Sequence, residues 1–122
     1  MDETFISIVV PTYNRAHLIA ETIQSLAEIN YKNYEIIIVD DGSTDNTEEV
    51  ISQFLNEKVT YHKKNNAERA AARIYGANLA KGEYINFFDS DDIAIDTHLL
   101  VANKLINQYN HPEWFHLAYA WA

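Results

Sequence analysis

Four short apolar runs alternate along the chain with segments in which apolar residues recur every three or four positions. The runs have the length and the β-branched and aromatic composition of strands, which are expected at residues 5–10, 34–39, 59–62 and 84–88. The first strand should stop at Pro11, which has no N–H to donate to a neighbouring strand. Because the runs are nearly continuous, they predict a sheet that is covered on both faces, with the last run as a buried strand.

The intervening segments predict helices. Apolar residues at helical spacing predict one helix at residues 18–29, and an alanine-rich segment predicts another at 68–81 whose small side chains permit close approach to the sheet. A third is expected at about residues 97–109. Asp45 and Glu48 have the spacing of a capping box, so a further helix should begin there. That helix is expected to carry Val50, Ile51, Phe54 and Leu55.

Residues with known capping preferences mark two helix ends. Gly82 is expected at the C-cap of the alanine-rich helix, and Asp96 is expected to cap the last helix at its N-terminus. After the break at Pro112, residues 114–121 should begin another strand.

Alternating strands and helices predict an α/β fold, with a mostly parallel sheet and right-handed crossovers, in one domain over residues 1–122. Open sheets of this kind bind ligands at the carboxyl ends of the strands. Three separate segments should bring polar and acidic groups to that edge. They contain Thr12, Tyr13, Asp40, Asp41, Asp89, Asp91 and Asp92.

The acidic cluster after the last predicted strand is a candidate metal site. Asp89 and Asp91 are two residues apart, so in extended backbone both side chains would point the same way and could share one ion. Carboxylates this close repel one another, and a hard cation such as Mg²⁺ or Mn²⁺ removes that conflict and accepts substrate phosphates. The alternative is a polar turn that caps the next helix.

Other polar residues suit a nucleotide, although each has a structural alternative. Asp41 could accept hydrogen bonds from a base or a ribose hydroxyl, or simply form a turn. Tyr13 could stack on a base, worth about 1–3 kcal/mol, or pack over the sheet edge. Arg69 and Arg73 lie four apart near a helix N-terminus, where a diphosphate would be favourable, or they pair with Glu68.

Composition narrows the classes of function. The net charge of −9 argues against a nucleic-acid partner. The absence of cysteine excludes disulfides and thiolate metal sites, and no apolar run is long enough to span a bilayer, so the chain is expected in the cytoplasm. The five histidines lack metal-ligand spacing and are expected to be structural or exposed. No phosphate-loop sequence GxxxxGK and no GxGxxG motif is present.

Taken together, five motifs resemble the beginning of a family 2 glycosyltransferase with the GT-A fold. The motifs are Val9 to Arg15, Ile38 to Asp45, Ala72-Arg73 followed by Gly76, Ala80 to Ile85, and Asp89 to Asp92. Their order and spacing match along essentially the whole chain, and the set is far more specific than any single motif.

The resemblance implies a nucleotide-diphosphate sugar donor and a saccharide or lipid-linked acceptor, in synthesis of a cell-surface polysaccharide. It implies that Asp41 binds the base, that Tyr13 stacks near it, and that the Asp89-Ser90-Asp91 unit, the DxD motif of the family, holds the cation and the ribose-diphosphate. The residues expected at the donor are Pro11, Thr12, Tyr13, Asp41, Arg73, Asp89 and Ser90, with Asp89 and Asp91 as ligands of Mg²⁺ or Mn²⁺.

The chain departs from the family in two respects. Glycine is frequent in the family where Glu68 stands, and asparagine where Ile74 stands, which affects the expected contacts to the donor phosphates. GT-A domains are also usually longer, and their later segment holds the acceptor site and the general base. The resemblance therefore implies the nucleotide-binding half, with donor binding but little or no transfer, in the cytoplasm or peripheral at the inner face of the membrane.

The sequence is also compatible with two other classes of function. One is a non-catalytic binding or interaction module that pairs through an exposed sheet edge with a partner or a second copy. The other is a phosphotransfer domain with Asp40 or Asp89 as nucleophile, which needs a lysine or hydroxyl side chain on a neighbouring strand end, and the sequence offers no convincing one.

Overall fold

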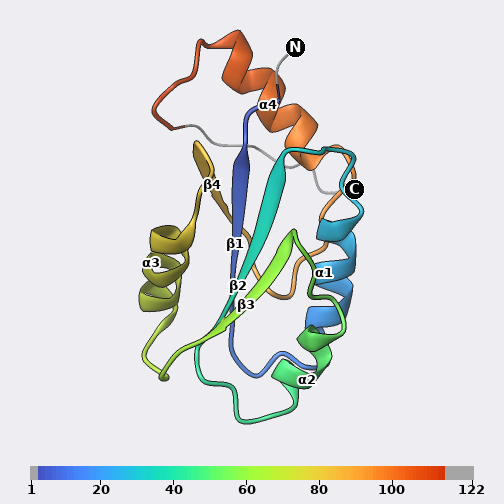
Figure 1. Ribbon diagram of the computed structural model, residues 1–122, viewed down its shortest axis with the longest axis vertical. Helices are drawn as coiled ribbons and strands as arrows, with labels where there is room; N and C mark the ends of the chain where they lie inside the picture. The colour runs from blue at the N-terminus through green and yellow to red at the C-terminus, as the bar shows by residue number, and fades with distance from the viewer. Residues whose placement is uncertain (1–2, 115–122) are drawn as a thin grey trace.

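The computed structural model describes residues 3–114. Its strands are β1 (Ile6–Thr12), β2 (Tyr34–Asp40), β3 (Val59–Lys63) and β4 (Tyr84–Phe87). Its helices are α1 (Ile19–Ala27), α2 (Thr47–Ser52), α3 (Arg69–Leu79) and α4 (His98–Gln108). Strands and helices alternate as expected (Figure 1). The strand expected at 114–121 lies, apart from its first residue, outside the described residues.

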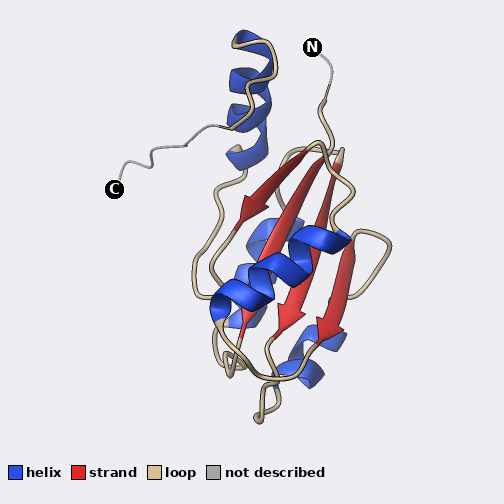
Figure 2. Ribbon diagram, turned by 90° about the vertical axis from the view of Figure 1, so that its left-hand side faces the viewer, coloured by secondary structure: helices blue, strands red, loops and turns tan. Residues whose placement is uncertain are grey.

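The four strands form one parallel sheet in the order β3-β2-β1-β4 (Figure 2). This confirms the α/β class and the parallel sheet. The larger core lies on the face covered by α1, α2 and α4, and a smaller one, built on Val9, Ile37, Val39 and Ala72, lies under α3. The carboxyl ends of β1 and β2 therefore meet at one edge, between α3 and the helices of the other face (Figure 1).

Strand β1 does not stop at Pro11 but continues to Thr12, with Pro11 opposite Val39 on β2. Successive residues of a parallel strand hydrogen-bond to alternate sides, and the carbonyl of Val9 accepts from Phe88 on the β4 side. Pro11 faces that same side, beyond the last pair of the β1–β4 ladder, Val9 with Phe87. Its missing N–H therefore costs the sheet no hydrogen bond.

The expectation of a buried strand at residues 84–88 is wrong, because β4 is at the edge of the described sheet. Ile85 is 40% exposed and Phe87 is 45% exposed. Both side chains lie on the same face of the sheet as α3. Helix α3 packs mainly on β1 and β2, so this face of β4 is left partly exposed. Tyr84 and Phe88 pack against the larger core on the opposite face.

Gly82 is not the C-cap of α3, since the helix ends at Ala80 with extended backbone. A Cβ atom on Gly82 would lie 2.6 Å from the backbone N of Ser7 and 2.9 Å from the carbonyl O of Phe5. Glycine is needed here because the chain passes directly against the start of β1. The close approach expected of the small residues in α3 is confirmed at Ala72 and Gly76, which are both buried.

The expected N-terminal caps also differ. Helix α2 begins at Thr47, whose backbone N–H donates to Asp45 at 3.0 Å, but the N–H of Asp45 donates to Asn14 and not to Glu48, so no capping box forms. The helix is short and ends at Ser52. Of the residues expected on its apolar face, Val50, Ile51 and Phe54 contact the larger core, whereas Leu55 is 45% exposed.

Helix α4 has Thr97 at its N-cap, with no hydrogen bond from the Thr97 side chain. Asp96 was the expected cap but precedes the N-cap. Its backbone carbonyl accepts a hydrogen bond from the N–H of Asn30 at 2.8 Å. None of the helices in the described part of the chain combines the length and apolar composition needed to cross a bilayer.

Candidate functional site

A cavity of about 300 Å³ opens where β1 and β2 end and α3 begins. It is lined by Pro11, Thr12, Tyr13, Arg15, Asp41, Asn66, Ala67, Arg69, Ala72 and Ser90. Five residues expected at the donor, Pro11, Thr12, Tyr13, Asp41 and Ser90, therefore surround a single space. The remaining two, Arg73 and Asp89, line the adjoining groove along β4, which has a volume of about 580 Å³.

Thr12 and Tyr13 present different groups to the cavity. Thr12 is 3% exposed, and its hydroxyl has no hydrogen-bond partner within residues 3–114. An unpaired buried hydroxyl is unfavourable, so a ligand that reaches it would gain a hydrogen bond that the protein leaves unmade. Tyr13 is 42% exposed beside it, which leaves the aromatic ring accessible for stacking.

Asp41 is nearly buried and already binds three neighbours. Its Oδ1 accepts from Lys64 Nζ at 2.7 Å and from the backbone N–H of Ala67 at 3.0 Å. Its Oδ2 has only a long contact of 3.5 Å from the amide of Asn66. A carboxylate oxygen accepts more than one hydrogen bond, so Oδ2 retains capacity for a donor on a ligand.

Asp40, the preceding residue, is fully buried and serves the fold. Its Oδ1 accepts from the N–H and the hydroxyl of Ser43 at 2.9 and 2.6 Å, and its Oδ2 accepts from the hydroxyl of Tyr61 at 2.5 Å. Burial and this hydrogen bond raise the pKa of Tyr61. With both oxygens engaged and no exposure, Asp40 is not available as a nucleophile.

Asn14 ties together the loops that follow β1 and β2. It has a positive φ of 50°, and its N–H donates to the hydroxyl of Ser43 at 2.8 Å. Its side-chain oxygen accepts the N–H groups of Thr44 and Asp45 at 2.8 and 3.3 Å. These bonds hold Tyr13 and the segment after Asp41 in a fixed relation.

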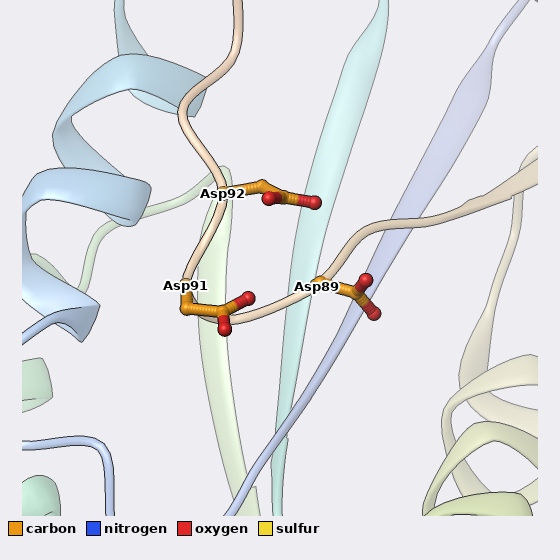
Figure 3. A group of neighbouring side chains, drawn as sticks. All are labelled: Asp89, Asp91 and Asp92. Atoms are coloured by element: carbon orange, nitrogen blue, oxygen red, sulfur yellow. The ribbon is translucent and has the colours of Figure 1, made fainter.

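The acidic loop after β4 brings Asp89, Asp91 and Asp92 together. One carboxylate oxygen from each lies within 4.8 Å of the others, and all three residues are exposed. In Figure 3 the side chains of Asp91 and Asp92 point across the turn toward the Asp89 side. The loop is anchored on α1, where the hydroxyl of Thr22 donates to the carbonyl of Ser90 at 2.9 Å.

This set of oxygens fits a hard divalent cation. Partial desolvation, and then the charges of Asp89 and Asp91, raise the pKa of Asp92. All-carboxylate ligation suits Mg²⁺ or Mn²⁺. Asp92 joins the two candidate ligands expected from the spacing, because the chain does not stay extended but turns at Ser90 and Asp91, where the N–H of Asp92 donates to the carbonyl of Asp89 at 3.2 Å.

Arg73 extends from α3 toward this loop. Its guanidinium lies 3.9 Å from Asp89 Oδ1 and 5.7 Å from the ring centroid of Phe87, and its Nε is buried without a partner among the described residues. No described ion pair joins Glu68 to Arg69 or Arg73, which was the structural alternative for these arginines.

Two residues of the cavity that sequence reasoning missed, Asn66 and Ala67, come from the loop after β3. Lys64, from the same loop, contacts Asp41 from outside the cavity, because β3 pairs with β2 and the loop passes beside Asp41. These residues could have been expected at the site only from the order of the strands in the sheet, which the sequence pattern does not supply. Three histidines interact with other side chains: His62 with Thr60 at 3.2 Å, His98 with Asn86 at 2.9 Å and His111 with Glu83 at 2.8 Å.

The glycosyl transferase family 2 model matches residues 7–111, almost the whole described chain. The chain belongs to this family. Among curated relatives, it is 44% identical over 91 residues to "Glycosyltransferase GlyG" of Streptococcus pneumoniae, covering 72% of this chain and 30% of that protein. It is 36% identical over 113 residues to the Escherichia coli "UDP-Glc:alpha-D-GlcNAc-diphosphoundecaprenol beta-1,3-glucosyltransferase WfaP", covering 87% of this chain and 45% of that protein.

Solved structures of glycosyltransferases share the fold. The chain matches S. aureus TarS 1-349 in complex with UDP-GlcNAc with a TM-score of 0.82 and 30% identity, over 87% of this chain and 32% of that one. It matches the mannosyltransferase PcManGT of Pyrobaculum calidifontis, in complex with GDP-Man and Mn²⁺, with a TM-score of 0.75 and 27% identity. This match covers 86% of this chain and 32% of that one. The chain thus spans less than half the length of these relatives. These matches confirm the expected family and the GT-A fold.

Proposed function

We propose that this domain binds a nucleotide-diphosphate sugar through a divalent cation, as the donor site of a glycosyltransferase that transfers the sugar to an acceptor hydroxyl. The observation that carries the proposal is the adjacency of two features. The 300 Å³ cavity with Asp41 and the unpaired Thr12 hydroxyl suits a nucleoside, and the acidic loop that contributes Ser90 to the same cavity suits a metal-bound diphosphate. Complexes of the structural relatives with UDP-GlcNAc and with GDP-Man and Mn²⁺ support it.

In this proposal each residue has a separate task. Asp41 and Thr12 hydrogen-bond the base, Tyr13 stacks on it, and Pro11 closes the floor of the cavity beside Ser90. Asp89 and Asp91 hold Mg²⁺ or Mn²⁺, with Asp92 beside them, and Arg73 faces the diphosphate from α3. When bound, the cation supplies charge stabilisation for the leaving diphosphate.

We propose that residues 1–122 form one nucleotide-sugar-binding domain. Acceptor recognition and the general base are then expected in a region outside these residues, as the greater length of the relatives allows. The WfaP name describes a lipid-linked acceptor, which supports a polysaccharide-type reaction with a saccharide or lipid-linked acceptor, in the cytoplasm or at the inner face of the membrane. By itself the domain is expected to bind donor with little or no transfer.

Calorimetric titration of UDP and GDP into the purified chain, with Mn²⁺ and then with a chelator, tests the proposal. Binding is expected only with the metal, because the cation bridges carboxylates and phosphates that otherwise repel. Asp91→Ala should abolish the metal-dependent part. Asp96→Ala is the matched control, since it removes the same charge from an exposed aspartate outside the cluster. Failure of the folded chain to bind either nucleotide with Mn²⁺ would contradict the proposal.

Within residues 3–114, β4 is the last strand of the sheet, which favours a second candidate, a non-catalytic interaction module. Ile85 and Phe87 are partly exposed on one face of β4, and an unpaired strand edge can pair with a partner or with a second copy of the chain. Light scattering across a range of protein concentrations separates the two. A concentration-dependent mass without nucleotide binding would favour the module.

A further inference from the structure

Lys64 lies behind Asp41, outside the nucleotide cavity. Its Nζ is 2.7 Å from Asp41 Oδ1, with the two side chains 14% and 9% exposed, and the same ammonium donates to the carbonyl of Asn65 at 2.7 Å. Lys64 lines a neighbouring, more open cavity and does not line the one that holds Asp41, Thr12 and Tyr13. Its contact with the residues of the nucleotide cavity is the ion pair with Asp41.

The two oxygens of Asp41 are held unequally. Oδ1 takes the ammonium of Lys64 and the N–H of Ala67, whereas Oδ2 has only the 3.5 Å contact from Asn66. Two bonds from fixed donors leave the carboxylate little freedom to rotate. An ionised carboxylate only accepts hydrogen bonds, so the ligand group that Oδ2 can bind is an N–H or O–H.

We propose that Lys64 is a positioning residue that fixes the Asp41 carboxylate and so makes the site selective for nucleotides whose base carries a ring N–H. Uracil, thymine and guanine offer such a hydrogen on their pairing edge. Cytosine and adenine present a lone pair at the equivalent ring nitrogen, which would face the carboxylate without a hydrogen between them. Sites built around a hydrogen bond reject ligands that lack it strongly, because a buried group is left unpaired.

This inference rests on the proposed function and concerns the base it accepts. The test compares affinities within two matched pairs, UDP with CDP and GDP with ADP, by calorimetry with Mn²⁺ present. Each pair has the same ring system and phosphates but differs at the ring nitrogen of the pairing edge and at the exocyclic groups beside it. For the pair that binds more tightly, the unmodified chain is expected to prefer the ring N–H member by at least about tenfold.

Lys64→Met should lower that preference at least threefold, because the carboxylate loses its fixed partner. A general loss of affinity would instead leave the ratio of the two dissociation constants unchanged. Lys64→Arg restores a charged donor and should recover most of the preference. Lys63→Met is the matched control. Lys63 is the preceding residue, exposed, and paired with Glu48 at 3.5 Å, so its removal should leave the ratio as it was.

A ratio in Lys64→Met equal to that of the unmodified chain would overturn the inference, as would an unmodified chain that binds both members of each pair equally. If none of the four nucleotides binds the folded chain, the proposed function itself fails. Circular dichroism verifies the fold of each variant, and Lys64→Gln, judged by the same criterion, replaces Lys64→Met if methionine prevents folding.

Discussion

The guanidinium of Arg73 on α3 lies 3.9 Å from the carboxylate of Asp89 in the acidic loop after β4. Both side chains are about half exposed, so the pair adds little to stability but places a cation beside the candidate metal ligands. We expect Arg73→Met, which keeps the aliphatic stem over Phe87, to weaken UDP binding with Mn²⁺ by about tenfold through loss of a charge-assisted contact to the diphosphate.

Uridine, which has no phosphate, should bind the Arg73→Met variant as it binds the unmodified chain. Calorimetry with both ligands separates a phosphate contact from a general disturbance of the cavity. Lys104→Met, which removes an exposed cation from α4, is the control for net charge. Equal losses for UDP and uridine would assign Arg73 a structural role only.

The buried His98 predicts a pH dependence of stability. Burial lowers the pKa of His98, whose Nε2 lies 2.9 Å from the side-chain oxygen of Asn86. The unfolded chain, with a pKa of about 6.5, binds the proton more readily than the folded chain, so stability is lost as pH falls below about 6.5. Melting temperatures between pH 7 and 5.5 should fall less steeply in His98→Gln.

The exposed His17 provides the control, because His17→Gln should keep the slope of the unmodified chain. The absolute stability of His98→Gln is expected to be lower at pH 7, where the packing against Phe88 is disturbed. Only the difference between pH values bears on the prediction. Parallel pH profiles for His98→Gln and the unmodified chain would refute it.

Gly76 sets the distance between α3 and the sheet. A Cβ atom at this position would lie 2.4 Å from Val9 Cγ1 and 3.1 Å from Val39 Cγ2. Gly76→Ala should therefore destabilise the domain by about 1–3 kcal/mol, even though alanine favours a helix by roughly 1 kcal/mol. Urea denaturation measures the change. Ala70→Val on the exposed side of α3 is the control and should cost only a few tenths of a kcal/mol, as expected from helix propensity.

Tyr61 should matter for stability but not for ligand choice. Its hydroxyl donates to the buried Asp40 at 2.5 Å, and Tyr61→Phe would leave that carboxylate oxygen without its partner. We expect a loss of about 1.5–3 kcal/mol in the free energy of unfolding and no change in the relative affinities for UDP and CDP. Tyr109→Phe, at an exposed position, is the control. An altered nucleotide preference would show that Asp40 also contributes to binding.

The sequence by itself determined the class of fold, the order of the elements and most of the residues around the cavity. Apolar runs and helical spacing depend on local burial patterns, which are written directly along the chain. The strand patterns pointed to Thr12, Tyr13 and Asp41, because parallel strands deliver their carboxyl ends to one edge. Pro11 and Ser90 were expected there only from the family resemblance. The family motifs added roles to these positions.

Only the tertiary structure decided which strands are neighbours and how each oxygen is partnered. The order β3-β2-β1-β4 places Lys64, Asn66 and Ala67 beside Asp41 and leaves β4 at the edge, although its sequence is as apolar as that of a buried strand. It also divides the adjacent carboxylates into a buried Asp40 and an Asp41 that lines the cavity. Strand order and hydrogen-bond partners depend on contacts between residues far apart in the chain, which a local pattern does not encode.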